Sequence, residues 1–251
     1  MTRQDLPAAY SRLRGLTDAR VALDTTGSSL TTSELLAFQY DWAQARDAVH
    51  FAVDFPTLAQ QMNAAGFETV HVTSAASSRP VYLRRPDLGR RLSDDGAARL
   101  APLEGSAPDI CVVVADGLSG LAVAEHSVEL MRVFSQRAER EGWRVSPVVL
   151  AEQGRVAIGD PIGSALDARL TVMIIGERPG LSAADSLGAY ITYAPAPGRT
   201  DAERNCISNI RPGGQSPEAA ADTMTYLIRH ALAQQLTGVG LKDQSHTLID
   251  P

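Results

Sequence analysis

The chain has few cysteines: Cys111 and Cys206 are the two among 251 residues, and they stand at unrelated positions. Two isolated cysteines cannot form a disulfide framework, and they do not match the paired spacing of a structural zinc site. This usage is typical of proteins in the reducing cytoplasm, where we expect the chain to be located.

Long apolar runs and a signal sequence are also absent from the sequence. No apolar run approaches the ~18 residues that a membrane-spanning helix needs, and residues 1–16 contain no continuous apolar segment typical of a secretory signal. Basic residues form no long cluster: 23 Lys and Arg are outnumbered by 29 Asp and Glu, for a net charge of -6. The composition therefore argues against binding to nucleic acid or to an anionic membrane.

The N-terminal part of the sequence is patterned for helices. Thr31 can cap a helix that Glu34 supports three residues further on, and apolar residues follow. A second helix is predicted over residues 56–65. The Arg-rich stretch 82–95 indicates a loop-rich connection with short strands or a helical turn. We therefore predict a helical N-terminal region and connection over residues 1–104.

A different pattern begins after residue 104, where apolar, β-branched runs alternate with amphipathic segments. Continuous apolar runs are typical of parallel strands that are buried on both faces, and their alternation with helices indicates an α/β fold. We therefore predict a Rossmann-like, doubly wound and mostly parallel sheet within residues 105–251. Strands are expected at residues 109–115, 145–150, 170–175 and 189–193, and helices are expected after Asp116, from Ser182 and from Ser216.

Common catalytic motifs are missing from the loops where such a fold binds its ligands. Ligands of open α/β sheets lie beyond the carboxyl ends of the strands, which directs attention to residues 116–120, 151–160 and 176–182. These loops contain neither the G-x-G-x-x-G pattern of dinucleotide binding nor the G-x-S-x-G pattern of a nucleophile elbow. The sequence also lacks a P-loop and an H-E-x-x-H zinc motif.

Single polar residues leave the function open. Glu177 follows a predicted buried strand, and a role in a functional site is weighed evenly against an ion pair or a turn. Ser119 is better explained as a helix cap than as a nucleophile. The five histidines are scattered, and we interpret them as surface or helix-end residues. Cys206, between the last predicted strand and the last helix, is interpreted as a small buried apolar side chain.

Six stretches taken together resemble the small, or light, subunit of ethanolamine ammonia-lyase. The resemblance covers residues 16–243, and the number and order of the stretches make it specific. They are LLAFQ at 35–39, ARDAVH at 45–50, ADGLS at 115–119, QGRVAIGD at 153–160, IGERPGL at 175–181 and NCISNIR at 205–211.

The resemblance implies a two-subunit lyase in which this chain is the non-catalytic member. The large subunit of the family is a TIM barrel that binds ethanolamine, and adenosylcobalamin lies between the two subunits in a hetero-oligomer. Radical chemistry of this cofactor gives acetaldehyde and ammonia. The cofactor contacts of the family's small subunit correspond to Val156, Glu177 and Cys206 in this sequence. Contact of Arg155 and Arg178 with the cofactor stays open.

Two departures from related proteins bear on these expectations. The D-x-H-x-x-G motif, whose histidine replaces the lower base of cobalamin, is absent, so the cofactor is expected to keep its own base. Family members from microcompartment-forming bacteria carry a longer N-terminal extension, and about fifteen residues precede the matched region here, which argues against encapsulation in a bacterial microcompartment. From the residues alone, a nucleotide-binding oxidoreductase and a scaffold without ligand remain alternatives.

Overall fold

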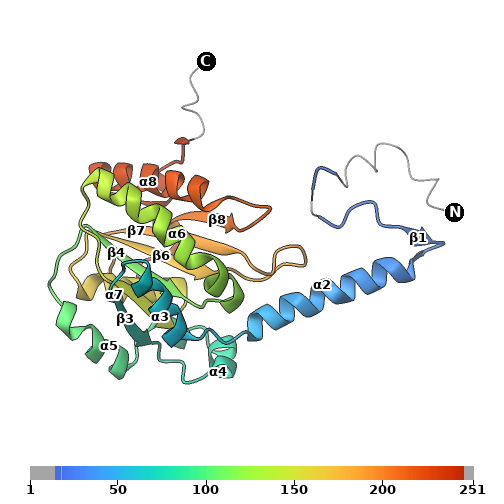
Figure 1. The fold of residues 1–251 in the computed structure, drawn as a ribbon, viewed down its shortest axis with the longest axis horizontal. Coiled ribbons are helices and arrows are strands. Elements are labelled where there is room, and N and C mark those ends of the chain that lie inside the picture. The colour runs from blue at the N-terminus through green and yellow to red at the C-terminus, as the bar shows by residue number, and fades with distance from the viewer. Residues whose placement is uncertain (1–14, 18, 246–251) are drawn as a thin grey trace, which may run out of the picture.

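A six-stranded sheet forms the centre of the chain, of which the computed structural model describes residues 15–17 and 19–245. The strands are β3 (Thr69–Thr73), β4 (Ile110–Ala115), β5 (Val148–Glu152), β6 (Leu170–Gly176), β7 (Leu187–Tyr193) and β8 (Asn205–Ile210). Their order across the sheet is β3-β5-β4-β6-β7-β8 (Figure 1). The first four strands in this order are parallel, whereas β7 is antiparallel to β6 and β8 to β7. The predicted α/β fold with a mostly parallel sheet is confirmed.

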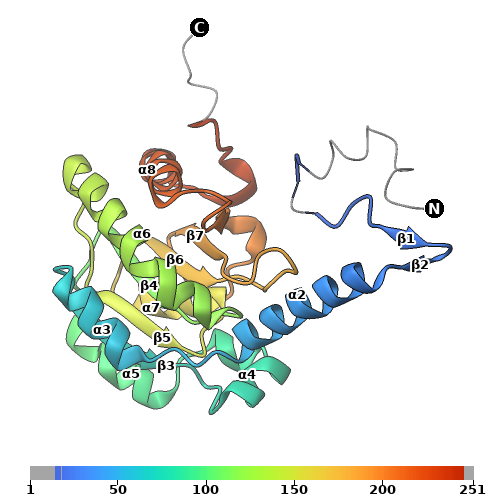
Figure 2. The ribbon, with the colours of Figure 1, turned by 45° about the vertical axis from the view of Figure 1, so that its right-hand side comes forward.

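Helices cover both faces of this sheet, as expected of a doubly wound fold (Figure 2). Alternate side chains of β4 enter two separate cores, because successive residues of a strand point to opposite faces. The first core also receives side chains from α3 (Phe55–Ala64), α6 (Gly120–Glu141) and α8 (Pro217–Gln234), and the second receives them from α5 (Asp94–Leu100) and α7 (Gly159–Ala165). All residues of β4 and β6 are buried, which explains their continuous apolar sequences.

One long helix, α2 (Thr32–His50), extends away from the sheet (Figures 1 and 2). It follows the short hairpin of β1 (Thr25–Thr26) and β2 (Ser29–Leu30). Its predicted cap is confirmed, since the Thr31 side chain accepts a hydrogen bond from the backbone of Glu34 at 3.4 Å. Within this helix, which is described throughout, Ala48 is the one buried residue. The helix therefore lacks a packed face, and it joins the rest of the fold at its C-terminal end, where Arg79 donates a hydrogen bond to the Val49 carbonyl at 2.8 Å.

One edge strand of the sheet, β3, precedes both the Arg-rich stretch and the predicted boundary at 104. Within β3, Thr69 lies opposite Val148 of β5 in a parallel pairing. Residues on the N-terminal side of the predicted boundary at 104 thus contribute to the sheet, and the division into 1–104 and 105–251 stays a prediction. The shorter helical segments are α4 (Arg79–Arg84), η2 (Leu88–Arg90), η3 (Ala101–Leu103), η4 (Val156–Ile158), η5 (Asp201–Glu203) and η6 (Gly238–Gly240).

The helix predicted from Ser182 is wrong. Residues 177–186 form a loop that connects β6 to its antiparallel neighbour β7. A serine followed three positions later by an acidic residue resembles a capping box, which is why the sequence suggested a helix. In the structure the Asp185 carboxylate instead lies 3.2 Å from the Nε2 atom of His126, on the distant helix α6. A long-range contact therefore overrides the local signal.

The predicted position of Cys206 is also wrong, because this residue lies inside a strand. It stands opposite Tyr190 in the antiparallel pair of β7 and β8. Only Ile207 and Ile210 are buried in β8, and its asparagines are a residue type that strands disfavour. The Cys206 side chain is exposed, so it is not the buried apolar residue that the sequence indicated.

No helix among the described residues combines the length and the apolar character needed to cross a membrane. The expectation that residues 1–16 carry no signal sequence concerns a segment that lies largely outside the described residues.

A buried ion pair attaches the β8 edge of the sheet to α7. The guanidinium group of Arg204, just before β8, donates two hydrogen bonds to the Asp160 carboxylate, both at 2.7 Å. Each of the two side chains is 2% exposed. Arg204 also donates to the Thr192 hydroxyl at 2.9 Å and to the Arg199 carbonyl at 3.0 Å. Because both charged groups are buried, removal of either one would leave the other buried without its partner.

We predict that Arg204→Met lowers the free energy of unfolding by about 3–5 kcal/mol, the usual cost of removing one member of a buried pair. Urea denaturation followed by circular dichroism measures the change. The matched control is Arg229→Met, since Arg229 pairs with Glu141 on the exposed surface, and this substitution should cost no more than about 1 kcal/mol. Equal losses in the two variants would contradict the role assigned to the buried pair.

Candidate functional site

A cleft lies at the carboxyl ends of β4 and β6, as the sequence predicted for this type of sheet. Its volume is about 710 Å³. It is bounded by the turns that follow β4, β5 and β6 and by part of β8. The lining residues include Tyr82, Gly117, Leu118, Arg155, Val156, Ile175, Glu177, Arg178, Tyr190, Ser208 and Asn209. The cleft therefore combines apolar side chains with charged and hydrogen-bonding groups.

The floor of the cleft depends on a close approach between two backbones. The turn after β4 lies against the end of β6, where the Leu118 amide donates a hydrogen bond to the Gly176 carbonyl at 2.9 Å. A Cβ atom on Gly176 would lie 2.0 Å from the Ser119 carbonyl oxygen, and one on Gly117 would lie 2.2 Å from the Gly176 carbonyl oxygen. Gly117 also has a positive φ of 58°, which favours glycine. Side chains at these two positions would separate the turn from the strand.

Ser119 connects this turn to the elements around it. Its hydroxyl oxygen accepts a hydrogen bond from the Ala122 amide at 3.2 Å, which confirms its prediction as the cap of α6. The same hydroxyl donates to the Ala184 carbonyl at 2.7 Å, within the 177–186 loop. The residue is fully buried. It therefore has a structural role, and the structure gives it no partner for nucleophilic catalysis among the described residues.

Glu177 is held in the cleft by contacts to one of its two carboxylate oxygens. The Oε2 atom accepts hydrogen bonds from the Ser186 hydroxyl at 2.6 Å and from the Asn209 backbone amide at 3.1 Å. The Glu177 amide also donates to the Ser186 carbonyl at 2.9 Å. Among the described residues, no group donates to Oε1. The arrangement fixes the carboxylate and leaves one acceptor oxygen for a ligand.

Val156 and Cys206 differ in their relation to the cleft. Val156 begins η4, lines the cleft and packs against the second core. Cys206 does not line the cleft itself. Its strand partner across β7 and β8, Tyr190, does line the cleft. Although this side chain is exposed, the protein atoms around it limit the solvation of the thiolate, and together with the negative charge of Glu177 they raise the pKa of the Cys206 thiol. The structure thus brings Val156 and Glu177 into one cleft and places Cys206 at its margin as a protonated thiol.

Tyr82 was not predicted as part of the site, although it forms one wall. Its ring is buried, its hydroxyl donates to the Gly154 carbonyl at 3.0 Å, and burial raises its pKa well above the ordinary value. The guanidinium groups of Arg79 and Arg155 lie 4.9 Å and 4.3 Å from the ring centroid. The Nε atom of Arg155 is buried without a hydrogen-bond acceptor among the described residues. Tyr82 and Arg155 are far apart in the chain, so no local motif could have indicated this contact.

Asp116 connects the segments that border the cleft. Its carboxylate accepts a hydrogen bond from the Gly154 amide at 3.1 Å and lies 3.4 Å from Arg79. Arg79 in turn donates to the carbonyls of Gly117 at 2.7 Å and Val49 at 2.8 Å, and it thereby ties the end of α2 to the turn after β4. Burial raises the pKa of Asp116 to about 6, although the positive charge of Arg79 opposes the shift.

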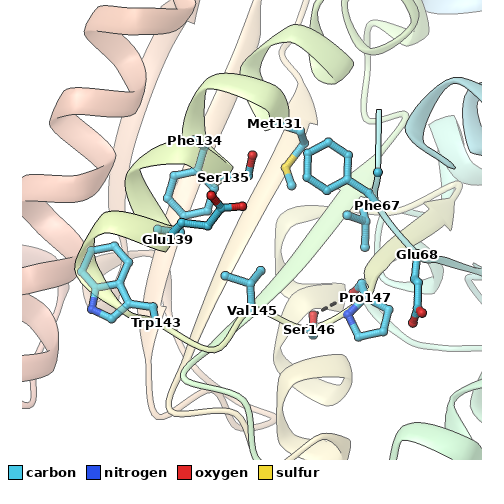
Figure 3. Close-up of a pocket in the computed structure, with 13 residues that line it drawn as sticks. Phe67, Glu68, Met131, Phe134, Ser135, Glu139, Trp143, Val145, Ser146 and Pro147 are labelled. Carbon is cyan, nitrogen blue, oxygen red and sulfur yellow. Dashed lines mark hydrogen bonds between the residues drawn. The ribbon is translucent and has the colours of Figure 1, made fainter. Parts of the chain in front are cut away.

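A second pocket opens at the opposite end of the sheet, between α6 and the start of β5 (Figure 3). Its volume is about 430 Å³. Side chains that line it include Phe67, Met131, Phe134, Glu139, Trp143 and Val145. None of the three residues singled out in the sequence lies here, so the cleft at the carboxyl ends of the strands is the candidate functional site.

We predict that Asp116 makes the chain less stable as the pH rises from about 4 to about 7. The pKa of this carboxyl is about 6 in the folded protein and 3.8 for an exposed aspartate, so the folded state binds more protons between these values. Its contribution to stability is therefore greatest below the lower pKa and is lost as the pH rises through the higher one.

The Asp116→Asn variant isolates this effect from the other carboxylates. Across the same pH range, its free energy of unfolding should increase relative to that of the unsubstituted protein by up to about 3 kcal/mol. Urea denaturation at each pH measures the difference between the two proteins. A difference that stays constant with pH would contradict the raised pKa.

Comparison with known proteins shows to which family the chain belongs. The family of the ethanolamine ammonia-lyase light chain matches residues 7–242. The ethanolamine ammonia-lyase small subunit of Pseudomonas putida is 54% identical over 236 residues, which cover 93% of this chain and 87% of that protein. The small subunit of Xanthomonas campestris pv. campestris is 52% identical over 240 residues, covering 94% and 88%. The chain therefore belongs to the ethanolamine ammonia-lyase light-chain family.

Proposed function

We propose that this chain is the small subunit of an adenosylcobalamin-dependent ethanolamine ammonia-lyase that converts ethanolamine to acetaldehyde and ammonia in the cytoplasm. In this proposal the chain holds the cofactor against a large, catalytic TIM-barrel subunit and supplies no catalytic residue itself. The observation that carries the proposal is the cleft that gathers Val156 and a fixed Glu177 carboxylate at the carboxyl ends of the parallel strands. Family membership supports the reaction and the two-subunit organisation.

The residues of the cleft fit part of a cobalamin. The cofactor has an apolar ring edged with amides and a nucleotide tail with hydroxyls, and the cleft offers both apolar and polar contacts. Pockets of about 300–1,000 Å³ enclose ligands of drug size, and adenosylcobalamin is larger. A cleft of about 710 Å³ can therefore cover one portion only, which suits a cofactor shared by two subunits. No histidine lines the cleft among the described residues, which supports a cofactor that keeps its own lower base.

Each proposed contact follows from the geometry of a side chain. The Oε1 atom of Glu177 can accept a hydrogen bond from an amide or a ribose hydroxyl, because Ser186 and Asn209 hold the other oxygen. Val156 offers apolar area, and the small thiol of Cys206 allows a close approach at the margin. When bound, adenosylcobalamin supplies radical chemistry through homolysis of its cobalt–carbon bond. The contribution of this chain is to bind, orient and exclude water.

The exposed helix α2 supports the proposal of a large partner subunit. Leu35, Phe38 and Trp42 lie three and four residues apart, which places them on one side of the helix. Their exposed fractions of 45%, 38% and 54% are high for such large apolar side chains. Exposed apolar stripes of this kind mark interaction surfaces. We propose that this stripe, the α2 stripe, packs against the large subunit.

We predict that Glu177→Ala and Ser186→Ala both weaken adenosylcobalamin binding without preventing assembly. Loss of the Glu177 carboxylate removes a charged hydrogen bond and should cost about 1.5–3 kcal/mol. Loss of the Ser186 hydroxyl should weaken cofactor binding by a smaller amount, because the Glu177 carboxylate remains but loses one of the hydrogen bonds that position it. Spectroscopic titration of the co-expressed two-subunit complex with the cofactor measures both effects, and release of acetaldehyde from ethanolamine tests the activity.

The matched control is Glu139→Ala, which removes a carboxylate from the pocket at the opposite end of the sheet and should leave cofactor affinity unchanged. Near-normal affinity in Glu177→Ala would reject the role of that residue. Failure of the unsubstituted complex to bind the cofactor, or binding of a nucleotide cofactor by the chain alone, would reject the proposed function itself.

We predict that Trp42→Ser weakens association with the large subunit by about 2 kcal/mol or more, as expected for an aromatic residue at the centre of an interface. Isothermal titration calorimetry between the two purified subunits measures the change. Val239→Ser is the control, because Val239 is 72% exposed on a separate part of the surface and should have no effect. If Trp42→Ser instead dissociates a self-associated form of this chain, the α2 stripe binds a second copy and the assignment to the large subunit is wrong.

A further inference from the structure

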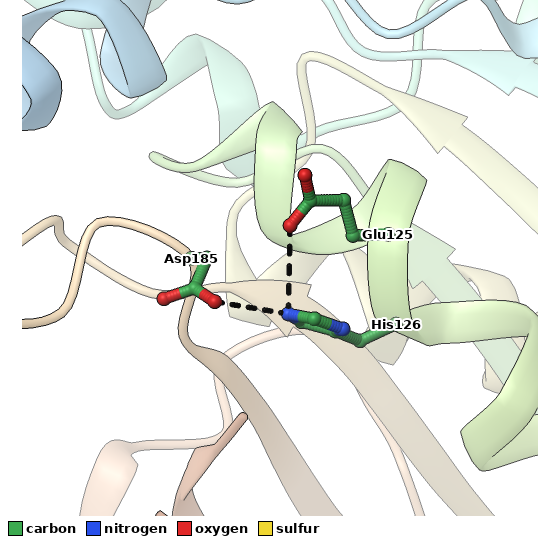
Figure 4. Close-up of side chains that lie close together, drawn as sticks. All are labelled: Glu125, His126 and Asp185. Carbon is green, nitrogen blue, oxygen red and sulfur yellow. Dashed lines mark hydrogen bonds and ion pairs between the residues drawn. The ribbon is translucent and has the colours of Figure 1, made fainter. Parts of the chain in front are cut away.

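His126 lies between two carboxylates on the surface of α6 (Figure 4). Its Nε2 atom is 3.2 Å from Oδ2 of Asp185 and 3.8 Å from Oε2 of Glu125. Glu125 is its neighbour in α6, whereas Asp185 belongs to the 177–186 loop. The cluster therefore joins two elements that are distant in the sequence. None of the three residues lies in the six stretches that carry the family resemblance or among the proposed cofactor contacts.

A single hydrogen bond accounts for one of the two carboxylates, the one of Asp185 at 3.2 Å. Both carboxylates approach the same nitrogen of the imidazole ring, as the two dashed lines in Figure 4 show. A ring nitrogen carries at most one proton, so it can donate to one of them. The second carboxylate then faces the nitrogen without a proton between them. A cation placed among the three groups would satisfy all of them together.

The spacing of the three groups suits a transition-metal ion. One ligand atom from each residue lies within 4.8 Å of the others. Ligand atoms bound at roughly 2.1 Å in a tetrahedral zinc site are about 3.4 Å apart, a value that falls between the two measured separations. Imidazole nitrogen and carboxylate oxygen are both ordinary ligands of Zn²⁺. Three protein ligands leave the fourth position for water.

The surroundings favour positive charge. A neighbouring pocket of about 410 Å³ is lined by the carboxylates of Asp41, Glu125 and Asp185. None of the residues that line it, all within the described chain, is Lys or Arg. Asp41 already pairs with Arg20 at 2.9 Å, whereas the described contacts of the Glu125 and Asp185 carboxylates are those to His126. On another side of the cluster, Arg211 lines a pocket together with Glu125 and His126, so the excess of negative charge is confined to the side that faces Asp41.

We propose that Glu125, His126 and Asp185 form a binding site for a divalent transition-metal ion of the Zn²⁺ type. The ion would attach the 177–186 loop to α6 through Asp185. Ser119 already anchors this loop through the adjacent Ala184 carbonyl, so the backbone that carries Asp185 is held in place without the metal. The residue after Asp185 is Ser186, whose hydroxyl holds Glu177. The site is therefore placed to stabilise the loop that positions Glu177, although metal binding itself does not rest on the proposed function.

The test uses the full-length chain, purified without a polyhistidine tag and stripped of metal with a chelator. Zn²⁺ is titrated by calorimetry, and Co²⁺ is titrated by absorption, because its visible bands report the coordination geometry. We expect one ion per chain. His126→Asn and Asp185→Asn should each weaken binding by more than the roughly 10–100-fold that follows loss of a group outside the ligand set. Circular dichroism confirms that each variant is folded.

Two controls separate this site from adventitious surface binding. Glu139→Gln removes the same charge from the same helix, away from the cluster, and His50→Gln removes an exposed histidine; both should bind the metal as the unsubstituted chain does. Hydrogen exchange of residues 177–186 should slow when Zn²⁺ is added, and only in proteins that retain the site. Absence of stoichiometric binding, or equal affinity in His126→Asn, would overturn the proposal and leave the cluster as an ion pair only.

Discussion

The contact between the turn after β4 and the end of β6 is the constraint on which the rest of the site depends. Gly117 and Gly176 allow the two backbones to meet, and a Cβ atom at either position would come within 2.2 Å of a carbonyl oxygen. Ser119 extends this contact to α6 and to the 177–186 loop. Glu177 follows Gly176 directly, so its carboxylate enters the cleft from a fixed backbone. A small shift of the turn would move every one of these groups.

The antiparallel extension of the sheet gives the cleft its second side. The return of the chain through β7 and β8 brings the Asn209 amide to the Glu177 carboxylate and places Cys206 beside Tyr190. A parallel neighbour of β6 would need a crossover connection of about a dozen residues or more, in place of the 177–186 loop that carries Ser186 and Asp185. Because β8 is polar and lies at an edge, its position depends on anchors such as the buried Arg204–Asp160 pair. The stability of this pair and the geometry of the site are therefore linked.

The proposed binding surfaces lie close to each other around the same loops. Arg79 joins the end of α2 to the turn after β4, so a partner bound along the α2 stripe would be coupled mechanically to the floor of the cleft. The proposed metal cluster includes Asp185, the neighbour of the Ser186 that holds Glu177, and Asp41 of α2 lines the pocket beside it. In this arrangement, partner, cofactor and metal would all act on one short loop and one turn. The open cleft would then be completed by the large subunit.

Much of the fold could be predicted from the sequence because its signals are local. Continuous apolar runs marked β4 and β6, and Thr31, Ser119 and Ser216 indicated helix starts that the structure confirms. The family motifs pointed to Val156, Glu177 and Cys206, and the first two do meet in one cleft. Only the tertiary structure decided that residues 177–186 form a loop, that Cys206 lies in an edge strand, and that Tyr82 stacks against Arg155. The physical reason is that these features depend on contacts between residues far apart in the chain, whose energies exceed the local preferences that a sequence pattern records.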